Sequence, residues 1–460
     1  MCGMVDRATS ARTLVLPLAL AQFIASYAAT NMNVAISEIS RDLGTTVLGV
    51  QTAITLFTLT MAALMIPGSK ITDRFGRKRC FVAGLLVYGV GALLAALAPG
   101  LGTMIVGYSL LEGVGSALLI PPIYILVTVA FPDVRSRAKY FGIVSGAAGL
   151  GSATGPLVGG FITSTISWRA SFLLQVVVVA GIVYLARRIV DPRRDDTAPR
   201  FDLTGAVLSG AGLVAVVLGF LSTGRFGWAN PTVWLLLAIG ALILYRFFRH
   251  IRTLERAGRE PLLPTRLFRD RTANLGLGTQ IAQWLTMQGS FFVISVYLQQ
   301  VHGYSAVKTG LLLTPATVGI LLASAGADRF ARRRQQRTLI VGGFATAAAG
   351  MLLLLLLGRG SAGTLGLVPG LLLVGFGVGV MLTSSVNLVQ SSFPESFQGE
   401  ISGLSRSVSN LGSSLGTALA GSILVAGGHP GGRPFAAALS TMLVITLVGL
   451  VLAALIPRQD

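Results

Sequence analysis

Charged side chains are scarce in this sequence, and so are the residues that build most enzymatic and metal sites. Only 12% of the 460 residues are charged, whereas about a quarter are charged in a soluble domain. Two cysteines, Cys2 and Cys80, give no disulfide framework, and the three histidines are scattered. Because no spacing suits a metal and no nucleophile can be paired with a base, we predict no enzyme, no cofactor and no metal site.

The chain is instead rich in long hydrophobic segments. Hydrophobic residues make up 53% of it, and the mean hydropathy is +0.75. The first apolar run is too long for a signal-peptide core and lacks a small-residue cleavage site, so we expect it to be retained. Runs long enough to cross a bilayer recur along the whole length. They predict fourteen spans, at residues 13–36, 47–67, 80–98, 102–130, 139–163, 170–189, 203–222, 231–248, 273–299, 307–327, 338–357, 364–390, 400–427 and 435–456.

The net charge of +19 would suit nucleic acid, but its distribution indicates a membrane topology instead. If successive loops alternate between the two sides, 30 of the 36 lysines and arginines fall on the side of the N-terminus. Positively charged loops stay in the cytoplasm. We therefore expect a multi-pass protein of the cell membrane with both termini cytoplasmic, the lipid bilayer as a partner and no nucleic-acid partner.

Short motifs recur between the two ends of the chain. Asp73-Arg74-Phe75 follows the second span and Asp328-Arg329-Phe330 follows the tenth, 255 residues later. Leu150-Gly151 and Gly155-Pro156 have counterparts in Leu411-Gly412 and Gly416-Thr417, 261 residues later. Such parallel repeats are typical of transporters. We predict six-span halves at residues 1–190 and 272–460, with two inserted spans and their charged linkers at 191–271. The second linker, 249–271, resembles an interfacial segment.

The fifth span carries a glycine and proline pattern made of Gly151, Gly155, Pro156, Gly159 and Gly160. Glycines four residues apart share a helix face and allow another backbone to approach closely. Proline removes a helical hydrogen bond and bends the axis. The pattern favours a hinge and seal between helices, although ordinary glycine-rich packing is the alternative.

A basic loop motif follows the second span, from Gly68 to Lys78. Gly76 permits a tight turn, and a carboxylate at Asp73 can pair with basic groups or with a neighbouring helix N-terminus. The motif either latches the two halves together or serves only as a positively charged topology signal. Its gating residues are expected to be Asp73, Arg74, Gly76 and Arg77.

Together these motifs resemble the fourteen-span drug–proton antiporter family of the major facilitator superfamily, over essentially the whole chain. The fifth-span pattern matches the family's antiporter motif C, and the basic loop matches its motif A. Smaller matches are Asn33-Val34-Ala35, Trp168-Arg169 and Phe201-Asp202-Leu203-Thr204-Gly205. The resemblance implies an all-α membrane protein of two six-helix bundles plus two inserted helices. It also implies motif A latching the outward-open state.

The same resemblance implies an activity. A member of this family exports amphipathic small molecules in exchange for protons by alternating access, and we expect this protein to do so as a monomer. One alternative is an exporter or facilitator dedicated to a single metabolite, lipid or self-made antibiotic. Another is a scaffold or sensor that transports nothing; the intact motif C and the lack of a soluble sensory domain argue against it.

Acidic residues inside spans are candidates for proton coupling, since each is costly in a bilayer. Glu112 lies in the middle of the fourth span, and Glu400 begins the thirteenth. Glu112 either carries the proton or is a permanently neutral side chain. The chain departs here from the family, which commonly has Asp at the position of Ala28 and Arg at the position of Ser109. Either the proton carrier has moved to Glu112 or the coupling is altered.

Polar stripes in the first, fourth, ninth and thirteenth spans predict the substrate cavity, although some of these side chains must serve as interhelical hydrogen-bond partners. Arg406 either offsets Glu112, binds an anionic substrate group or extends to the interface. The predicted lining consists of Gln22, Ser26, Thr30, Asn33, Tyr108, Gln280, Gln283, Trp284, Met287, Gln288, Arg406 and Asn410.

Overall fold

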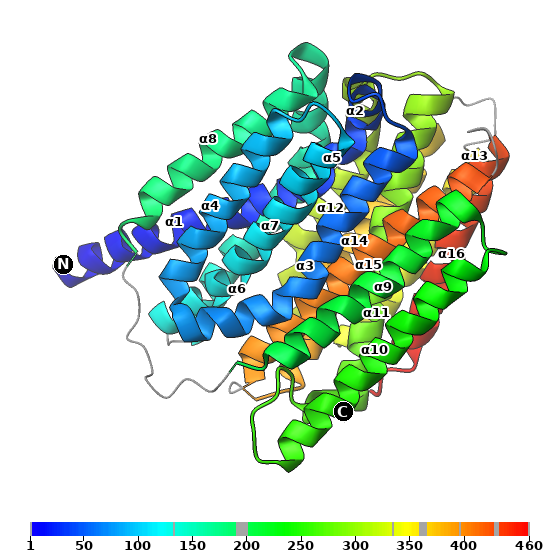
Figure 1. Ribbon diagram of the computed structural model, residues 1–460. Coiled ribbons are helices and arrows are strands. Elements are labelled where there is room, and N and C mark those ends of the chain that lie inside the picture. Colours follow the sequence, from blue (N-terminus) through cyan, green and yellow to red (C-terminus); the bar gives the residue numbers. More distant parts are fainter. Residues whose placement is uncertain are drawn as a thin grey trace.

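A computed structural model describes residues 2–131, 134–189, 201–333, 335–357, 366–394, 397–426 and 432–458, and within them the chain is helical without strands. Each predicted span coincides with a helix (Figure 1). The bounds are α1 (Cys2–Asn31), α3 (Val47–Phe75), α4 (Arg77–Ala96), α5 (Leu101–Met104) continuing through η2 (Ile105–Glu112) into α6 (Gly113–Ala130), α7 (Val134–Thr165), α8 (Trp168–Ala186), α9 (Leu203–Phe226), α10 (Pro231–Arg256), α11 (Arg271–Val296) continuing into η4 (Tyr297–Val301), α12 (Ala306–Arg333), α13 (Gln336–Leu357), α14 (Leu367–Ser391), α15 (Gln398–Ala426) and α16 (Gly432–Ala454).

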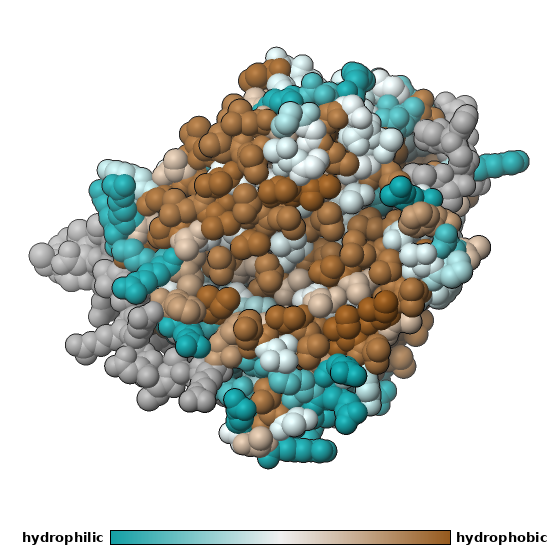
Figure 2. Space-filling model, in the orientation of Figure 1, coloured by the Kyte–Doolittle hydropathy of each residue, from teal (hydrophilic) through white to brown (hydrophobic). Residues whose placement is uncertain are grey.

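The described helices are those of a multi-pass membrane protein. Thirteen are long and apolar enough to cross a bilayer, and hydrophobic side chains cover the middle of the face in Figure 2 between hydrophilic ends. The fourteenth, α15, has 29 residues but is rich in serine. Its hydroxyls are satisfied inside the protein, because Ser405 bonds Gln280, Ser407 bonds the Ala62 carbonyl and Ser414 bonds the Thr55 carbonyl.

Two bundles repeat the same helix packing. In the first bundle α7 packs on α1, and a Cβ at Gly151 would overlap the Phe23 carbonyl. In the second bundle α15 packs on α11, and a Cβ at Gly412 would lie 2.6 Å from the Ile281 oxygen. Equivalent glycines therefore permit equivalent close contacts, as the sequence repeat predicts.

The two bundles meet along two seams. One is formed by α3 and α15, and the other by α7 and α12. The inserted hairpin α9–α10 covers the first, since α9 packs on both α3 and α15. A Cβ at Gly224 would lie 3.1 Å from Leu48 and 3.6 Å from Ser422. The α9–α10 hairpin therefore makes the molecule asymmetric about the two seams.

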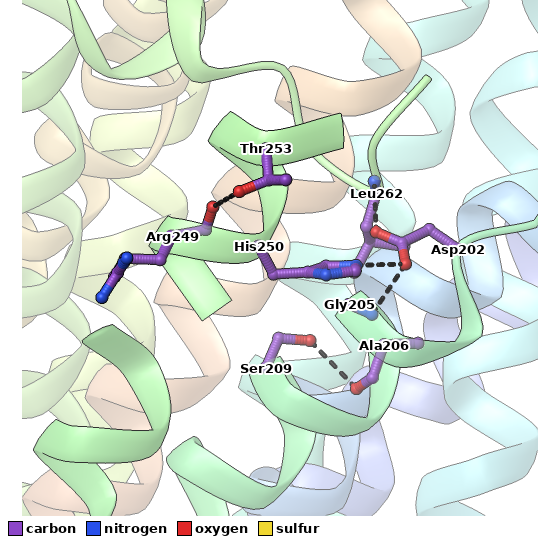
Figure 3. A network of polar contacts seen from close by, with 8 residues as sticks. All are labelled: Asp202, Gly205, Ala206, Ser209, Arg249, His250, Thr253 and Leu262. Carbon is purple, nitrogen blue, oxygen red and sulfur yellow. Dashed lines mark hydrogen bonds and ion pairs between the residues drawn. The ribbon is translucent and has the colours of Figure 1, made fainter. Parts of the chain in front are cut away.

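A carboxylate anchors the inserted hairpin at one end. Asp202 caps α9 by accepting from the Gly205 amide at 2.8 Å, and it also contacts His250 of α10 at 2.8 Å (Figure 3). Its other oxygen accepts from the Leu262 amide at 3.2 Å. Three leucines of the linker after α10, Leu262, Leu263 and Leu267, are buried in a cluster with side chains of α10, α11 and α15.

The molecule thus has two ends, which we name by their loops. The basic face holds the α3–α4 turn, the loop after α10 and the start of α15. The opposite face holds the connections α1–α3, α7–α8, α9–α10 and η4–α12. The linker residues 190–200 lie outside the described residues.

Candidate functional site

At the opposite face the α7–α12 seam is closed. The Val307 amide donates to Ser164 at 3.1 Å, and Thr317 donates to the Ala153 carbonyl at 3.2 Å. A Cβ at Gly160 would lie 2.7 Å from the Ala306 oxygen. Helices this close exclude substrate and water. Gly160, expected to form part of a seal, lies in this contact.

The same face of α7 is open nearer the basic face. Gly142, Gly146 and Gly149 lie in helical phase with Ala153, Pro156 and Gly160, at steps of three and four residues. A Cβ at any of these three glycines would meet no heavy atom within 4 Å. The α7–α12 seam is therefore sealed at one end and opens toward the basic face.

The α3–α15 seam is closed along its length. Near the opposite face the Gln51 amide donates to the carbonyls of Thr417 and Ala418, at 2.9 and 3.2 Å. At the basic face Lys70 forms an ion pair with Glu400 at 2.9 Å and with Glu260 of the linker at 3.0 Å. Contacts therefore hold the α3–α15 seam at both faces, and the open stretch lies beside α7 near the basic face.

Thr30 shows why the proline of α7 is tolerated. Pro156 has no N–H, so the Ser152 carbonyl four residues earlier lacks its helical donor. The Thr30 hydroxyl donates to that carbonyl at 3.2 Å. Gly155 makes the approach possible, because a Cβ there would overlap the Thr30 hydroxyl. In this conformation Thr30 satisfies the α7 backbone.

The predicted lining residues divide by exposure. Ser26, Trp284, Arg406 and Asn410 are half-buried, whereas the other eight are buried. Several buried ones bond neighbouring helices: Tyr108 donates to the Ala28 carbonyl at 3.2 Å, and Gln280 bonds the Ser385 carbonyl at 3.1 Å. Others retain unsatisfied atoms in this conformation, namely Gln22, Asn33, Gln283 and Gln288; Met287 is 3% exposed.

Glu112 lies inside the first bundle. It ends the π-helical turn η2 and is fully buried. Tyr88 of α4 and Tyr108 are its titratable neighbours, and neither carboxylate oxygen has a hydrogen-bond partner of normal geometry. An ionised carboxylate without a compensating partner is very unfavourable in such a place.

Among the motif A residues, Gly76 makes the predicted turn with a φ of 99°, a conformation that favours glycine. Arg74 is exposed and Arg77 is half-buried, while the side chain of Asp73 lies outside what the structure describes. One ion pair that crosses the seam here comes from Lys70, a residue that the sequence placed in the loop.

Sequence reasoning also missed two contacts between the bundles. Gln299 donates to the Asn33 carbonyl at 3.0 Å and accepts from the Ser37 amide at 3.0 Å, tying η4 to the end of α1. Arg406 of α15 donates to the Tyr124 hydroxyl of α6. A glutamine or tyrosine within an apolar run indicates a buried hydrogen bond, but the fold determines which residue is its partner.

The chain was also compared with known proteins. Residues 18–417 match the Major Facilitator Superfamily. The chain is 33% identical to the puromycin resistance protein pur8 of Streptomyces alboniger, over 87% of this chain and 79% of that protein. It is 28% identical to the multidrug resistance protein Stp of Mycobacterium tuberculosis, over 86% and 72%. It is 28% identical to the tetracenomycin C resistance and export protein of Streptomyces glaucescens, over 89% and 75%.

Proposed function

The chain belongs to the major facilitator superfamily, and from this premise we propose that it exports amphipathic organic compounds in exchange for protons. The observation that carries the proposal is the one-sided opening between the bundles. The α7–α12 seam is closed at Ser164–Val307 and open around Gly142–Gly149. A pathway sealed at one end is what alternating access requires.

The direction of transport follows from the charges at the two ends. Lysines and arginines concentrate at the basic face, so we assign that face to the cytoplasm and place both termini there. The open stretch of the α7–α12 seam then faces the cytoplasm, while Lys70 and Glu400 close the α3–α15 seam at the same face. Relatives named for antibiotic resistance and export support the outward direction.

The proton is assigned to Glu112. It is a fully buried carboxyl beside Tyr88, and neither of its oxygens has a hydrogen bond of normal geometry; protonation decides whether a charge is buried there. Substrate and proton would occupy different places, because Glu112 lies inside the first bundle rather than in the seam. One proton entering through a membrane potential of about 100 mV supplies about 2.3 kcal/mol, in addition to any pH gradient.

A dedicated exporter of one compound is the second candidate. It is favoured by the relatives whose names carry a single antibiotic, such as puromycin or tetracenomycin C. The multidrug name of another relative favours the broader reading. The two differ in the number of compounds that the protein transports.

Purified protein in proteoliposomes tests both. We expect uphill movement of several amphipathic compounds when a pH gradient is imposed, and none when it is collapsed. Uphill transport of one compound alone would replace multidrug export by dedicated export. Transport that does not depend on the pH gradient would contradict proton coupling.

A further inference from the structure

Arg406 is a cation placed where the two bundles face each other. It lies eight residues into α15 from Gln398, so about 12 Å along the helix from its start at the basic face. Its guanidinium donates to the Tyr124 hydroxyl and lies 5.0 Å from the centre of that ring. Tyr124 belongs to α6 of the other bundle, so this contact joins the two bundles.

This cation has no carboxylate partner among the described residues. Glu400, one and a half turns earlier in α15, is bound by Lys70 at 2.9 Å. Glu112 is enclosed in the first bundle and fully buried. The described parts of α1, α7 and α11 that cross the membrane contain no acidic residue. An ionisable side chain at membrane depth marks a functional site by default.

The surroundings of Arg406 suit an aromatic molecule. The Phe141 ring of α7 lies 5.8 Å from the Tyr124 ring, next to the open stretch that begins at Gly142. One turn deeper, the Asn410 side-chain amide donates to the Arg406 carbonyl at 3.0 Å. The site combines a planar cation, two rings and an amide.

We propose that Arg406, with Tyr124 and Phe141, binds the anionic group of an aromatic amphipathic substrate and makes the transporter prefer anionic over cationic compounds. This inference rests on the proposed export function and adds the charge class of the substrate. The guanidinium supplies fixed donors for a carboxylate, sulfonate or phosphate, and the rings contact the aromatic part.

Binding to purified protein in phosphatidylcholine nanodiscs tests the inference without a pH gradient. The probes are naphthalene-2-sulfonate and naphthalen-2-yl-trimethylammonium, which share one ring system and differ in charge. We expect wild-type protein to bind the sulfonate about tenfold or more tightly than the ammonium compound. Equal binding, or a preference for the ammonium compound, would overturn the inference.

Variants locate the preference. Arg406→Gln should remove the difference between the probes, while Arg406→Lys should keep part of it because the charge remains. Arg187→Gln is the matched control, since Arg187 also lies over a tyrosine ring, at 5.9 Å from Tyr184, but directly after the end of α8 and away from the seam. Sulfonate preference that persists in a folded Arg406→Gln protein would contradict the inference, as would its loss in Arg187→Gln.

An anionic lipid headgroup presents the same chemistry, so nanodiscs containing phosphatidylglycerol form a further arm. We expect the sulfonate affinity to stay within about twofold. If phosphatidylglycerol weakens sulfonate binding to the wild-type protein but not to Arg406→Gln, the site binds the lipid headgroup and the inference is overturned. Transport separates the two proposals: sulfonate binding without transport of any compound would refute export alone, and export of cations without sulfonate binding would refute the inference alone.

Discussion

At the scale of single residues, several described side chains have a buried polar atom without a partner, and Glu112 differs from the others in having two such atoms. Glu112 has two unpartnered oxygens although its neighbours Tyr88 and Tyr108 are bonded: Tyr88 donates to Gln175, and Tyr108 donates to the Ala28 carbonyl. A buried polar group without a partner is costly and needs an explanation. Proton uptake and release supply one, because the carboxyl can act only if it is not permanently bonded.

Replacing Glu112 by Gln tests this explanation. The amide keeps the shape of the side chain but cannot titrate, so uphill, pH-driven export should vanish while substrate binding and downhill exchange persist. Transport into proteoliposomes with and without a pH gradient measures both. Glu400→Gln is the control. If it fails while Glu112→Gln still pumps, the proton site belongs to α15; if both pump, no membrane carboxylate couples transport.

Asp42 at the opposite face gives a prediction about pH and stability. The Arg169 hydrogen bond holds the pKa of Asp42 below its usual value, and Trp168 also donates to this carboxylate, at 3.0 Å. A lowered pKa means that the pair stabilises the fold above the ordinary aspartate value of about 3.9 and that this contribution is lost as pH falls through the folded value.

We therefore expect Asp42→Asn to lower stability at neutral pH by about 0.2–1 kcal/mol, since both partners are partly exposed. Thermal unfolding in detergent, followed by tryptophan fluorescence, measures the change. The difference from wild type should shrink as the pH falls below about 3.9. A difference that is independent of pH would mean that the carboxylate charge is not what stabilises this contact.

At the scale of the elements, helix positions were predictable because a bilayer leaves few choices. Backbone groups in lipid must bond within the segment, so each long apolar run became a helix. The ends were less predictable: α3 extends to Phe75, beyond the apolar run, and its last turns contain the Thr72 bond to the Gly68 carbonyl and the Lys70–Glu400 ion pair. The π-helical turn η2 was not predictable, since it lies in the tight packing of Gly91 against Gly107.

The close helix packing at the candidate site was predictable from the sequence, but the pairs of residues that contact each other were not. Motif C indicated close packing, and Gly151, Gly155 and Gly159 do pack on α1. The sequence did not show that Thr30 would satisfy the carbonyl freed by Pro156, or that Arg406 would reach Tyr124. Those contacts join residues more than a hundred positions apart, so they depend on the bundle geometry rather than on local pattern.

The packing of α7 on α1 leads to a prediction for Gly155→Leu. The new side chain would collide with the Thr30 hydroxyl and the Asn31 backbone, separating the helices and exposing the Ser152 carbonyl. We expect transport to be abolished while expression falls only modestly, at a stability cost of about 1–3 kcal/mol. Gly181→Leu in α8 is the control, because a Cβ there meets nothing within 4 Å. Normal transport in Gly155→Leu would show that motif C serves only ordinary helix packing.

At the scale of the whole molecule, sidedness is the first prediction to settle. The basic face carries most lysines and arginines, so we expect it to lie in the cytoplasm. A reporter fused after Asp460 should score cytoplasmic, and so should an epitope tag inserted within residues 191–200. A periplasmic score for either would invalidate the predicted number of spans or the inward assignment of the opening.

Alternating access also requires the closed end of the α7–α12 seam to open. Ser164 of α7 contacts Val307 of α12 across the seam, whereas Thr286 and Thr446 contact each other at 3.1 Å within the second bundle. With Cys2 and Cys80 replaced by serine, we expect oxidation of Ser164→Cys/Val307→Cys to stop transport and reduction to restore it. The Thr286→Cys/Thr446→Cys pair should tolerate oxidation, because each bundle moves largely as a rigid body. Unimpaired transport by the cross-linked α7–α12 pair would show that this contact need not open, and the alternating-access proposal would then fail.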